Sequence, residues 1–237
     1  MREALIKGQI RIKELWIAEG KRSARAKEIL RMAEDRGVPV KFKKSALLGQ
    51  SMPGIVHQGI VALAAEFSYL DFNTLVDRSL DAPGHALLIA ADHITDEGNL
   101  GALIRTAAFF GSHGLILPKD RSAKVTKGVK KRSAGAYVNL PVARVVNLSR
   151  ALDVLDTKGF WIIGAAGEAP ENIYHFDWNR NLILVLGSEE RGLSRWVRNR
   201  CHQLVSIPSQ GQVESLNVSV ACGIILSEIV RQRRRDK

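Results

Sequence analysis

The chain is poor in cysteine and contains no long apolar run. Its 237 residues include only two cysteines, Cys201 and Cys222, which cannot form the disulfide framework of a secreted domain and have no metal-type partner nearby in the sequence. The longest apolar runs, such as residues 86–91, fall far short of the roughly 18–20 residues that cross a bilayer. Residues 1–13 mix charge with glycine and lack the apolar stretch of a secretion signal. We therefore expect a soluble, cytoplasmic protein with reduced thiols, no membrane anchor and no metal.

Acidic residues are also in deficit. The chain has 24 Asp and Glu against 35 Lys and Arg, a formal net charge of +11, and its isoelectric point is near 10.0. Such a basic chain is typical of nucleic-acid binders, because Lys and Arg displace the counterions condensed on phosphates. A hydrophobic content of 46% with 25% charged residues is that of a globular protein and excludes a disordered or fibrous one.

The densest basic segment lies between residues 119 and 132. Lys124, Lys127 and Lys131 are spaced i, i+3, i+7, which would place them on one face of a helix. A solvated helix face is the commoner explanation of such a stripe. Because Asp120 is the single acidic residue in this segment and does not offset the repulsion among its basic side chains, we predict instead that these lysines bind RNA. A second cluster, at residues 231–235, is interpreted as a solvated tail.

A turn-forming stretch at residues 81–85 indicates a domain boundary. The residues before it predict a small α/β unit, and those after it alternate strands with helices, which indicates a mostly parallel sheet covered on both faces. We predict two domains, residues 1–80 and 86–237. In the first, strands are expected at 14–18, 38–42 and 59–66, with a helix at 23–36. In the second, strands are expected at 86–91, 114–117, 140–145, 160–165, 182–186 and 204–207, with helices at 100–110, 148–158 and 218–233.

Polar side chains follow three of the predicted strands, where ligands bind in parallel sheets. The first loop contains Asn99, a candidate helix cap, and Gly101, which permits a close backbone approach. The second loop places a polar pair between two glycines. The third loop contains Ser215 and Asn217 ahead of an apolar helix. Taken singly, each loop is explained by helix caps and turns.

Taken together, the three loops are specific in order and spacing. They resemble the three motifs of the SpoU/TrmH branch of the SPOUT methyltransferase superfamily. The matching segments are Asn99-x-Gly101-x-x-x-Arg105, Gly187-x-Glu189-x-x-Gly192 and Ile207-Pro208-x-x-Gly211-x-x-x-Ser215-Leu216-Asn217-Val218. In the first domain, His57-Gln58-Gly59 is similar to the end of the small ribosomal-protein-like RNA-binding domain of two-domain members, which implies RNA contacts for His57 and Gln58.

The resemblance implies an α/β fold whose second domain is a parallel sheet with a trefoil knot. It implies that S-adenosylmethionine is the methyl donor and S-adenosylhomocysteine the product. By position, the donor would be held by Gly187, Ile207 and Leu216, with residues 165–167 (Ala165, Ala166 and Gly167) as a further wall. The implied acceptor is a ribose 2′-hydroxyl of RNA, most closely a guanosine of 23S ribosomal RNA.

The resemblance also implies the catalytic set, namely Asn99, Arg105, Glu189, Ser215 and Asn217. A guanidinium does not lose its proton under ordinary conditions, so we expect Arg105 to hold a phosphate and stabilise the developing alkoxide. Glu189 would orient Arg105 or accept the proton, and Ser215 and Asn217 would position the ribose. The arginine of such proteins reaches across a dimer interface, which implies a homodimer with composite sites.

Alternative functions remain open at this point. Within the same class, the substrate could be a transfer RNA, or an adenosine of ribosomal RNA methylated by a resistance-type enzyme. From another class, the chain could be a ribosome-assembly protein that binds RNA without methylating it. A nicotinamide-binding Rossmann enzyme is excluded, because no GxGxxG follows a predicted strand.

Overall fold

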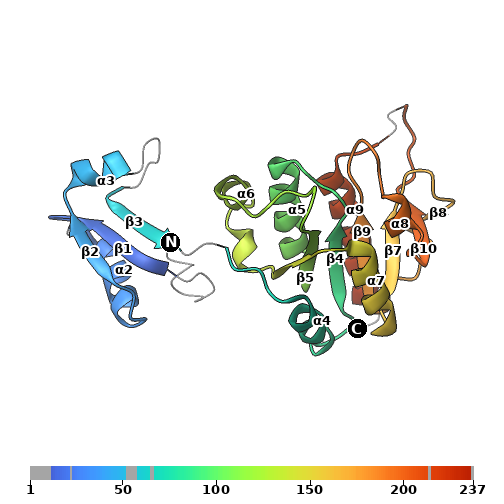
Figure 1. The fold of residues 1–237 in the computed structure, drawn as a ribbon, viewed down its shortest axis with the longest axis horizontal. Helices are drawn as coiled ribbons and strands as arrows, with labels where there is room; N and C mark the ends of the chain where they lie inside the picture. Colours follow the sequence, from blue (N-terminus) through green and yellow to red (C-terminus); the bar gives the residue numbers. More distant parts are fainter. Residues whose placement is uncertain (1–11, 22, 52–57, 65–66, 213–214, 236–237) are drawn as a thin grey trace. The chain divides into compact units, whose positions relative to one another are not determined.

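The computed structural model describes residues 12–21, 23–51, 58–64, 67–212 and 215–235 (Figure 1). The chain divides into two compact units, Met1–Ser68 and Tyr69–Lys237. Each unit has its own sheet and its own buried core. No described helix is long and apolar enough to cross a membrane.

The first unit is a three-stranded sheet flanked by two helices, where three strands and one helix were predicted. Strand β1 (Ile12–Ala18) lies in the centre, parallel to β2 (Val40–Lys43) and antiparallel to β3 (Ile60–Ala64). Helix α2 (Ala24–Glu34) begins after Ser23, whose hydroxyl accepts a hydrogen bond from the N–H of Ala26. A second helix, α3 (Ser45–Ser51), was not predicted. Residues of β1 pack against α2 in one cluster and against Leu48 of α3 in another.

The second unit is built on a seven-stranded sheet in the order β6-β5-β4-β9-β7-β10-β8, and all of its strand pairs are parallel. The prediction of a parallel sheet with alternating helices is confirmed. The strands are β4 (Leu87–Ala91), β5 (Gly114–Pro118), β6 (Val142–Val145), β7 (Trp161–Ala165), β8 (Glu171–Asn172), β9 (Leu182–Leu186) and β10 (Gln203–Ser206). The predicted knot stays a prediction.

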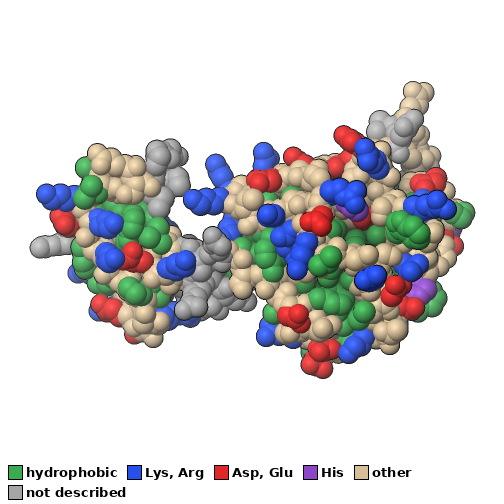
Figure 2. All heavy atoms as spheres, viewed as in Figure 1, with side chains coloured by type: hydrophobic (Ala, Val, Ile, Leu, Met, Phe, Trp, Pro, Cys, Tyr) green, Lys and Arg blue, Asp and Glu red, His purple; other side chains and the backbone are tan. Residues whose placement is uncertain are grey.

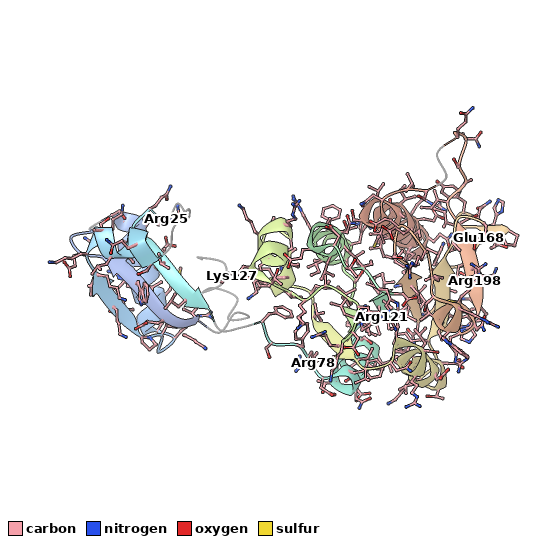
Figure 3. All side chains as sticks on the ribbon, turned by 45° about the horizontal axis from the view of Figure 1, so that its top comes forward. Arg25, Arg78, Arg121, Lys127, Glu168 and Arg198 are labelled. Atoms are coloured by element: carbon pink, nitrogen blue, oxygen red, sulfur yellow. The ribbon has the colours of Figure 1, made fainter. Side chains whose placement is uncertain are left out.

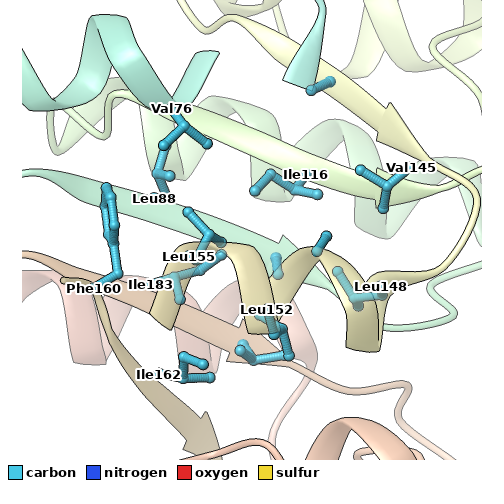
Figure 4. Close-up of a cluster of buried hydrophobic side chains, with 14 of the residues drawn as sticks. Val76, Leu88, Ile116, Val145, Leu148, Leu152, Leu155, Phe160, Ile162 and Ile183 are labelled. Atoms are coloured by element: carbon cyan, nitrogen blue, oxygen red, sulfur yellow. The ribbon is translucent and has the colours of Figure 1, made fainter. Parts of the chain in front are cut away.

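Helices cover both faces of this sheet (Figure 1). One face packs against α4 (Phe72–Leu80), α7 (Leu148–Thr157) and α8 (Arg195–Arg198). Figure 4 shows this core, in which Leu152 and Leu155 of α7 meet strand residues such as Ile183. On the opposite face α5 (Glu97–Phe109) lies beside α6 (Lys127–Arg132), the short 3₁₀ helix η1 (Ala136–Val138) and α9 (Val218–Arg235).

Helix α4 belongs to the second unit, so the division between the units lies before the predicted boundary. Its apolar residues Leu75 and Val76 are buried in the core of the large sheet, and Leu70 forms a parallel β-bridge with Ala143 of β6. The turn at residues 81–85 therefore connects α4 to β4 within one unit. A turn signal marks a chain reversal, whereas the boundary depends on where the apolar side chains of α4 are buried.

One arginine of the basic C-terminal cluster is held by the fold and is not part of a solvated tail. Arg233 lies half-buried on α9, and its guanidinium donates hydrogen bonds to the carbonyl groups of Trp178 (3.2 Å), His85 (2.9 Å), Ala86 (3.4 Å) and Arg180 (2.7 Å). Burial lowers the pKa of this guanidinium to about 10, so it remains charged at neutral pH. The arginine thus anchors the end of α9 to the starts of the strands.

Candidate active site

The loops that follow β4, β9, β7 and β10 meet at the carboxyl edge of the sheet. These four strands are consecutive neighbours and parallel, so residues that follow them emerge side by side. This arrangement brings together segments that lie far apart in the sequence. The second and third predicted motifs begin in these loops, and the first begins in the first turn of α5, after the loop that follows β4.

Asn99, Glu189 and Asn217 form one hydrogen-bonded cluster at this edge. The side-chain amide of Asn99 donates to Glu189 Oε1. The Asn217 amide donates to Asn99 Oδ1 at 2.8 Å and to Glu189 Oε1 at 3.3 Å. One residue from each of the three motifs therefore takes part, and two amide groups hold one carboxylate.

The cap of α5 is Asp96, whereas the sequence suggested Asn99. The Asp96 carboxylate accepts a hydrogen bond from the N–H of Asn99 at 2.7 Å, which places Asn99 in the first turn of the helix and leaves its side chain free for the cluster. Asn217 does cap its helix: its Oδ1 accepts from the N–H of Ser219 at 3.0 Å. Ser215 is exposed. Among the described residues, no hydrogen bond joins it to the cluster.

Arg105 lies away from this cluster. It is exposed on α5 and lines a groove of about 740 Å³ between α5 and α9, together with Phe109, Val220 and Ile224. Within the described chain, no hydrogen bond or ion pair joins Arg105 to Glu189, and an orienting role of Glu189 across two subunits stays a prediction. Six residues of helix turn the side chain to about 120° from the direction of Asn99.

The residues predicted to hold the cofactor follow three adjacent strands. Residues 165–167 lie at the end of β7, Gly187 at the end of β9 and Ile207 at the end of β10. Leu216 is an apolar side chain left 45% exposed. A Cβ on Gly187 would stand 2.1 Å from the carbonyl carbon of Gly192, so the loop closes on itself only with glycine there.

At Gly101, where the sequence predicted a close backbone approach, the neighbour is another helix of the same chain and not a ligand. A Cβ on Gly101 would lie 2.7 Å from the Cβ of Arg132 and 3.2 Å from the carbonyl oxygen of Val129. Both neighbours belong to α6, so Gly101 allows α6 to pack directly on α5. It serves helix packing at this point of the fold.

The predicted basic stripe is divided. Helix α6 begins at Lys127 after its cap Thr126, so Lys124 lies outside the helix and the prediction of a three-lysine helical face is wrong. Lys124, Lys127 and Lys131 are all exposed, and basic side chains project from the surface near α6 (Figures 2 and 3, where Lys127 is labelled). In the first unit Gln58 is exposed at φ 46°, and His57 lies outside the described residues.

Asp92 was not singled out from the sequence. It is fully buried directly after β4, where its Oδ2 accepts a hydrogen bond from the N–H of Ser194 at 2.7 Å and its Oδ1 lies 2.6 Å from His93 Nδ1. The carboxylate ties the loop that leads to Asn99 to the loop that carries Glu189. The available signal was a carboxylate immediately after a buried strand. In the described part of the chain no group of three or more His, Cys, Asp or Glu could hold a metal.

Comparison with known proteins gives two family matches. Residues 86–227 match the SpoU rRNA Methylase family, and residues 2–70 match the RNA 2′-O ribose methyltransferase substrate binding family. The chain is 40% identical to the Escherichia coli strain K12 protein named 23S rRNA (guanosine-2′-O-)-methyltransferase RlmB, over 94% of this chain and 91% of the relative.

Solved structures are similar as well. The SpoU methyltransferase AviRb from Streptomyces viridochromogenes, in complex with the cofactor AdoMet, superimposes with a TM-score of 0.81 at 28% identity, covering 98% of this chain and 88% of that one. The A. aeolicus TrmH/SpoU tRNA modifying enzyme has a TM-score of 0.58 at 28% identity, covering 70% of this chain and 85% of that one.

Proposed function

This chain belongs to the SpoU rRNA methylase family, and from that premise we propose that it methylates the ribose 2′-hydroxyl of a guanosine in 23S ribosomal RNA. The predicted family is thereby confirmed: the chain is an S-adenosylmethionine-dependent RNA 2′-O-methyltransferase with an N-terminal substrate-binding domain. The choice of guanosine and of 23S RNA rests on the 40% identity to the E. coli enzyme named for that reaction.

The carboxyl edge at β9, β7 and β10 fits a cofactor that is held by backbone groups. Gly187, Ile207 and residues 165–167 would line the slot, and the exposed Leu216 offers an apolar surface for adenine. S-adenosylmethionine supplies an electrophilic methyl group carried on a sulfonium. The protein supplies orientation, which alone can contribute roughly 7–11 kcal/mol to a well-aligned displacement.

We assign to Glu189 the role of general base, which accepts the proton of the attacking ribose 2′-hydroxyl. Both amide donors of the cluster reach Oε1, so they fix the carboxylate while Oε2 faces no described donor. Oε2 would accept the proton of the 2′-hydroxyl as its oxygen takes the methyl group that bound S-adenosylmethionine would supply, with S-adenosylhomocysteine as the product. Asn99 and Asn217 act as positioning residues, and the exposed Ser215 would contact the ribose.

We assign Arg105 to the active site of a partner subunit in a homodimer, and not to the cluster of its own chain. Its groove between α5 and α9 contains large exposed apolar side chains, with Phe109 82% exposed and Val220 49% exposed. A second copy of the chain that covers this groove would bury them and carry Arg105 toward the partner's cluster. There the guanidinium would hold a phosphate and stabilise the developing alkoxide.

RNA is the macromolecular substrate, and two exposed regions are assigned to it. One is formed by Lys124, Lys127 and Lys131, whose charges are available to phosphates. The other is the predicted His57-Gln58 element of the substrate-binding unit. The first unit would then recognise RNA, and the second would hold phosphates with its lysines and carry out the transfer.

The test is tritium transfer from labelled S-adenosylmethionine into protein-free 23S ribosomal RNA and, in parallel, into transfer RNA, followed by nucleoside analysis. We expect label in 23S RNA as 2′-O-methylguanosine. Label in transfer RNA, or as 2′-O-methyladenosine, would overturn the substrate assignment and keep the chemistry. Cofactor binding without transfer to naked RNA or to assembling large subunits would favour a non-catalytic assembly protein.

A further inference from the structure

A second groove opens at the other half of the carboxyl edge. It has a volume of about 390 Å³ and lies beyond β4, β5 and β6, against the first turns of α7 and α8. The side chains that characterise it are His93, Arg121, Val146, Arg150, Trp196 and Arg200. None of them belongs to the three motifs or to the slot assigned to the cofactor.

Two positive charges in this groove are available to a ligand. Arg200 pairs with Asp153, and His93 lies against the buried Asp92. Arg121 and Arg150 are exposed, and no described carboxylate pairs with either one; Figure 3 labels Arg121 on the second unit. Asp120 also lines the groove, which leaves an excess of positive charge facing solvent.

An aromatic ring and an apolar side chain stand beside these arginines. Trp196 is 69% exposed and Val146 is 73% exposed, although burial of such side chains is favourable. The backbone that presents Trp196 is held in place, because Ser149 Oγ donates to its carbonyl oxygen at 3.3 Å. An exposed ring next to guanidinium groups is the combination on which single-stranded nucleic acids stack their bases.

The backbone of the groove is strained at two positions. His93 has φ 59° and Arg121 has φ 49°, the left-handed region that non-glycine residues rarely adopt. Buried Asp92, bonded to Ser194 and His93, helps to hold the first of these turns. Strain of this kind is kept where a fold must aim particular side chains.

We propose that this groove binds a single-stranded segment of the RNA next to the reacting nucleotide, with one base stacked on Trp196 and phosphates held by Arg121 and Arg150. The proposal rests on the proposed function for the identity of the ligand. Its position follows from two loops: the loop from His93 runs on to Asn99, and the loop from Glu189 runs on to Ser194. A strand of RNA in the groove therefore lies beside the reacting cluster.

The experiment compares the full-length protein with four variants. Trp196→Ala removes the ring, and Trp196→Phe keeps an aromatic surface. Arg121→Gln with Arg150→Gln removes both charges from the groove. Arg195→Ala is the matched control, because Arg195 is exposed next to Trp196 and does not line the groove. The probes are a labelled single-stranded RNA of about 12 nucleotides, protein-free 23S ribosomal RNA as methyl acceptor, and S-adenosylmethionine alone.

We expect Trp196→Ala to weaken oligomer binding by about 5- to 100-fold, as the loss of one stacked base does. Trp196→Phe should restore most of the affinity and abolish part of the fluorescence quenching that RNA causes in the wild type. The double glutamine variant should make the salt dependence of binding shallower by about 1.4 in the log–log slope. In methyl transfer, KM for RNA should rise with kcat and cofactor affinity unchanged.

Unchanged oligomer affinity and KM in Trp196→Ala and in the double variant would overturn the proposal. An equal loss in Arg195→Ala would also overturn it, since the effect would then belong to general surface charge. The two proposals fail separately. If the wild-type protein methylates 23S RNA and the groove variants have no effect, the proposed function is supported and the groove proposal is overturned. If the wild-type protein transfers no methyl group but its oligomer binding still depends on Trp196, the groove proposal is supported and the proposed function is overturned.

Discussion

The two edges of the large sheet use the same residue types in opposite ways. At the amino edge, polar side chains satisfy the backbone. Asn181 Oδ1 accepts from the N–H of Ala86 at 2.7 Å, and His113 Nδ1 accepts from the N–H of Leu87 at 3.0 Å. Arg233 completes this edge by donating to four carbonyl groups. The polar groups of these side chains are therefore occupied by hydrogen bonds to the backbone at the strand ends.

At the carboxyl edge some polar side chains also bind the backbone, as Asp92 does, but others bind one another or face solvent. Asn99 and Asn217 hold Glu189, and Arg121 and Arg150 are exposed. In these examples the side chains at the amino edge bind the backbone of the strand ends, whereas Asn99, Arg121 and Arg150 at the carboxyl edge leave their polar groups to the cluster or to solvent. The comparison predicts that changes at the carboxyl edge reduce activity and changes at the amino edge reduce stability.

The largest expected effect is that of Glu189→Gln. The amide keeps the shape of the side chain and can still accept from Asn99 and Asn217, but it cannot take the ribose proton. We expect kcat to fall by about 100-fold or more, with cofactor affinity and melting temperature unchanged. Single-turnover methyl transfer and thermal unfolding measure the two. A variant that loses stability and keeps its turnover would break the comparison.

Arg105→Ala tests whether the site is composite. Alone, this variant should lose most of its turnover, since the guanidinium no longer stabilises the alkoxide. Mixed in equal amounts with Glu189→Gln and refolded together, half of the dimers are mixed, and each of these contains one intact site. About a quarter of wild-type activity should then return. No recovery in verified mixed dimers would place Arg105 and Glu189 in the same subunit's site.

At the amino edge, Arg233→Ala should reduce the free energy of unfolding by about 2–4 kcal/mol, because partly buried carbonyl groups lose a charged donor. Its turnover per folded molecule should match the wild type. Arg234→Ala is the matched control, since Arg234 is exposed one position further along α9. Chemical denaturation of both variants provides the measurement, and equal losses would argue against an anchoring role.

The smallest effect concerns His113 and pH. Burial, with a smaller contribution from the charge of Arg233, holds the pKa of His113 below its ordinary value of 6.5. As pH falls below about 6.5, the imidazole of His113 is therefore protonated in the unfolded chain while it stays neutral in the folded protein. The free energy of unfolding should fall with pH from there down to the lower pKa that His113 has in the folded state. His113→Asn offers an acceptor that does not titrate, so its unfolding free energy should decline less between pH 7 and 5. Parallel curves would contradict this assignment.

The sequence by itself determined the parallel sheet, most of its strands and the family. Strands buried on both faces are apolar runs that can be recognised without a partner, as in β4 and β9. The motif residues are also local in spacing, so their order along the chain was sufficient to identify them. Secondary structure and motif identity depend on near neighbours in the chain, which the sequence displays directly.

Only the tertiary structure decided which polar residues meet. Asn99 and Asn217 are 118 positions apart in the sequence, and Arg105, a motif neighbour of Asn99, lies on another face of the same helix. The burial of α4 in the second unit, the anchoring of Arg233 and the exposure of Trp196 likewise depend on contacts between distant segments. Such contacts arise when the strands are placed side by side, because the sheet order, and not the chain order, determines which loops become neighbours.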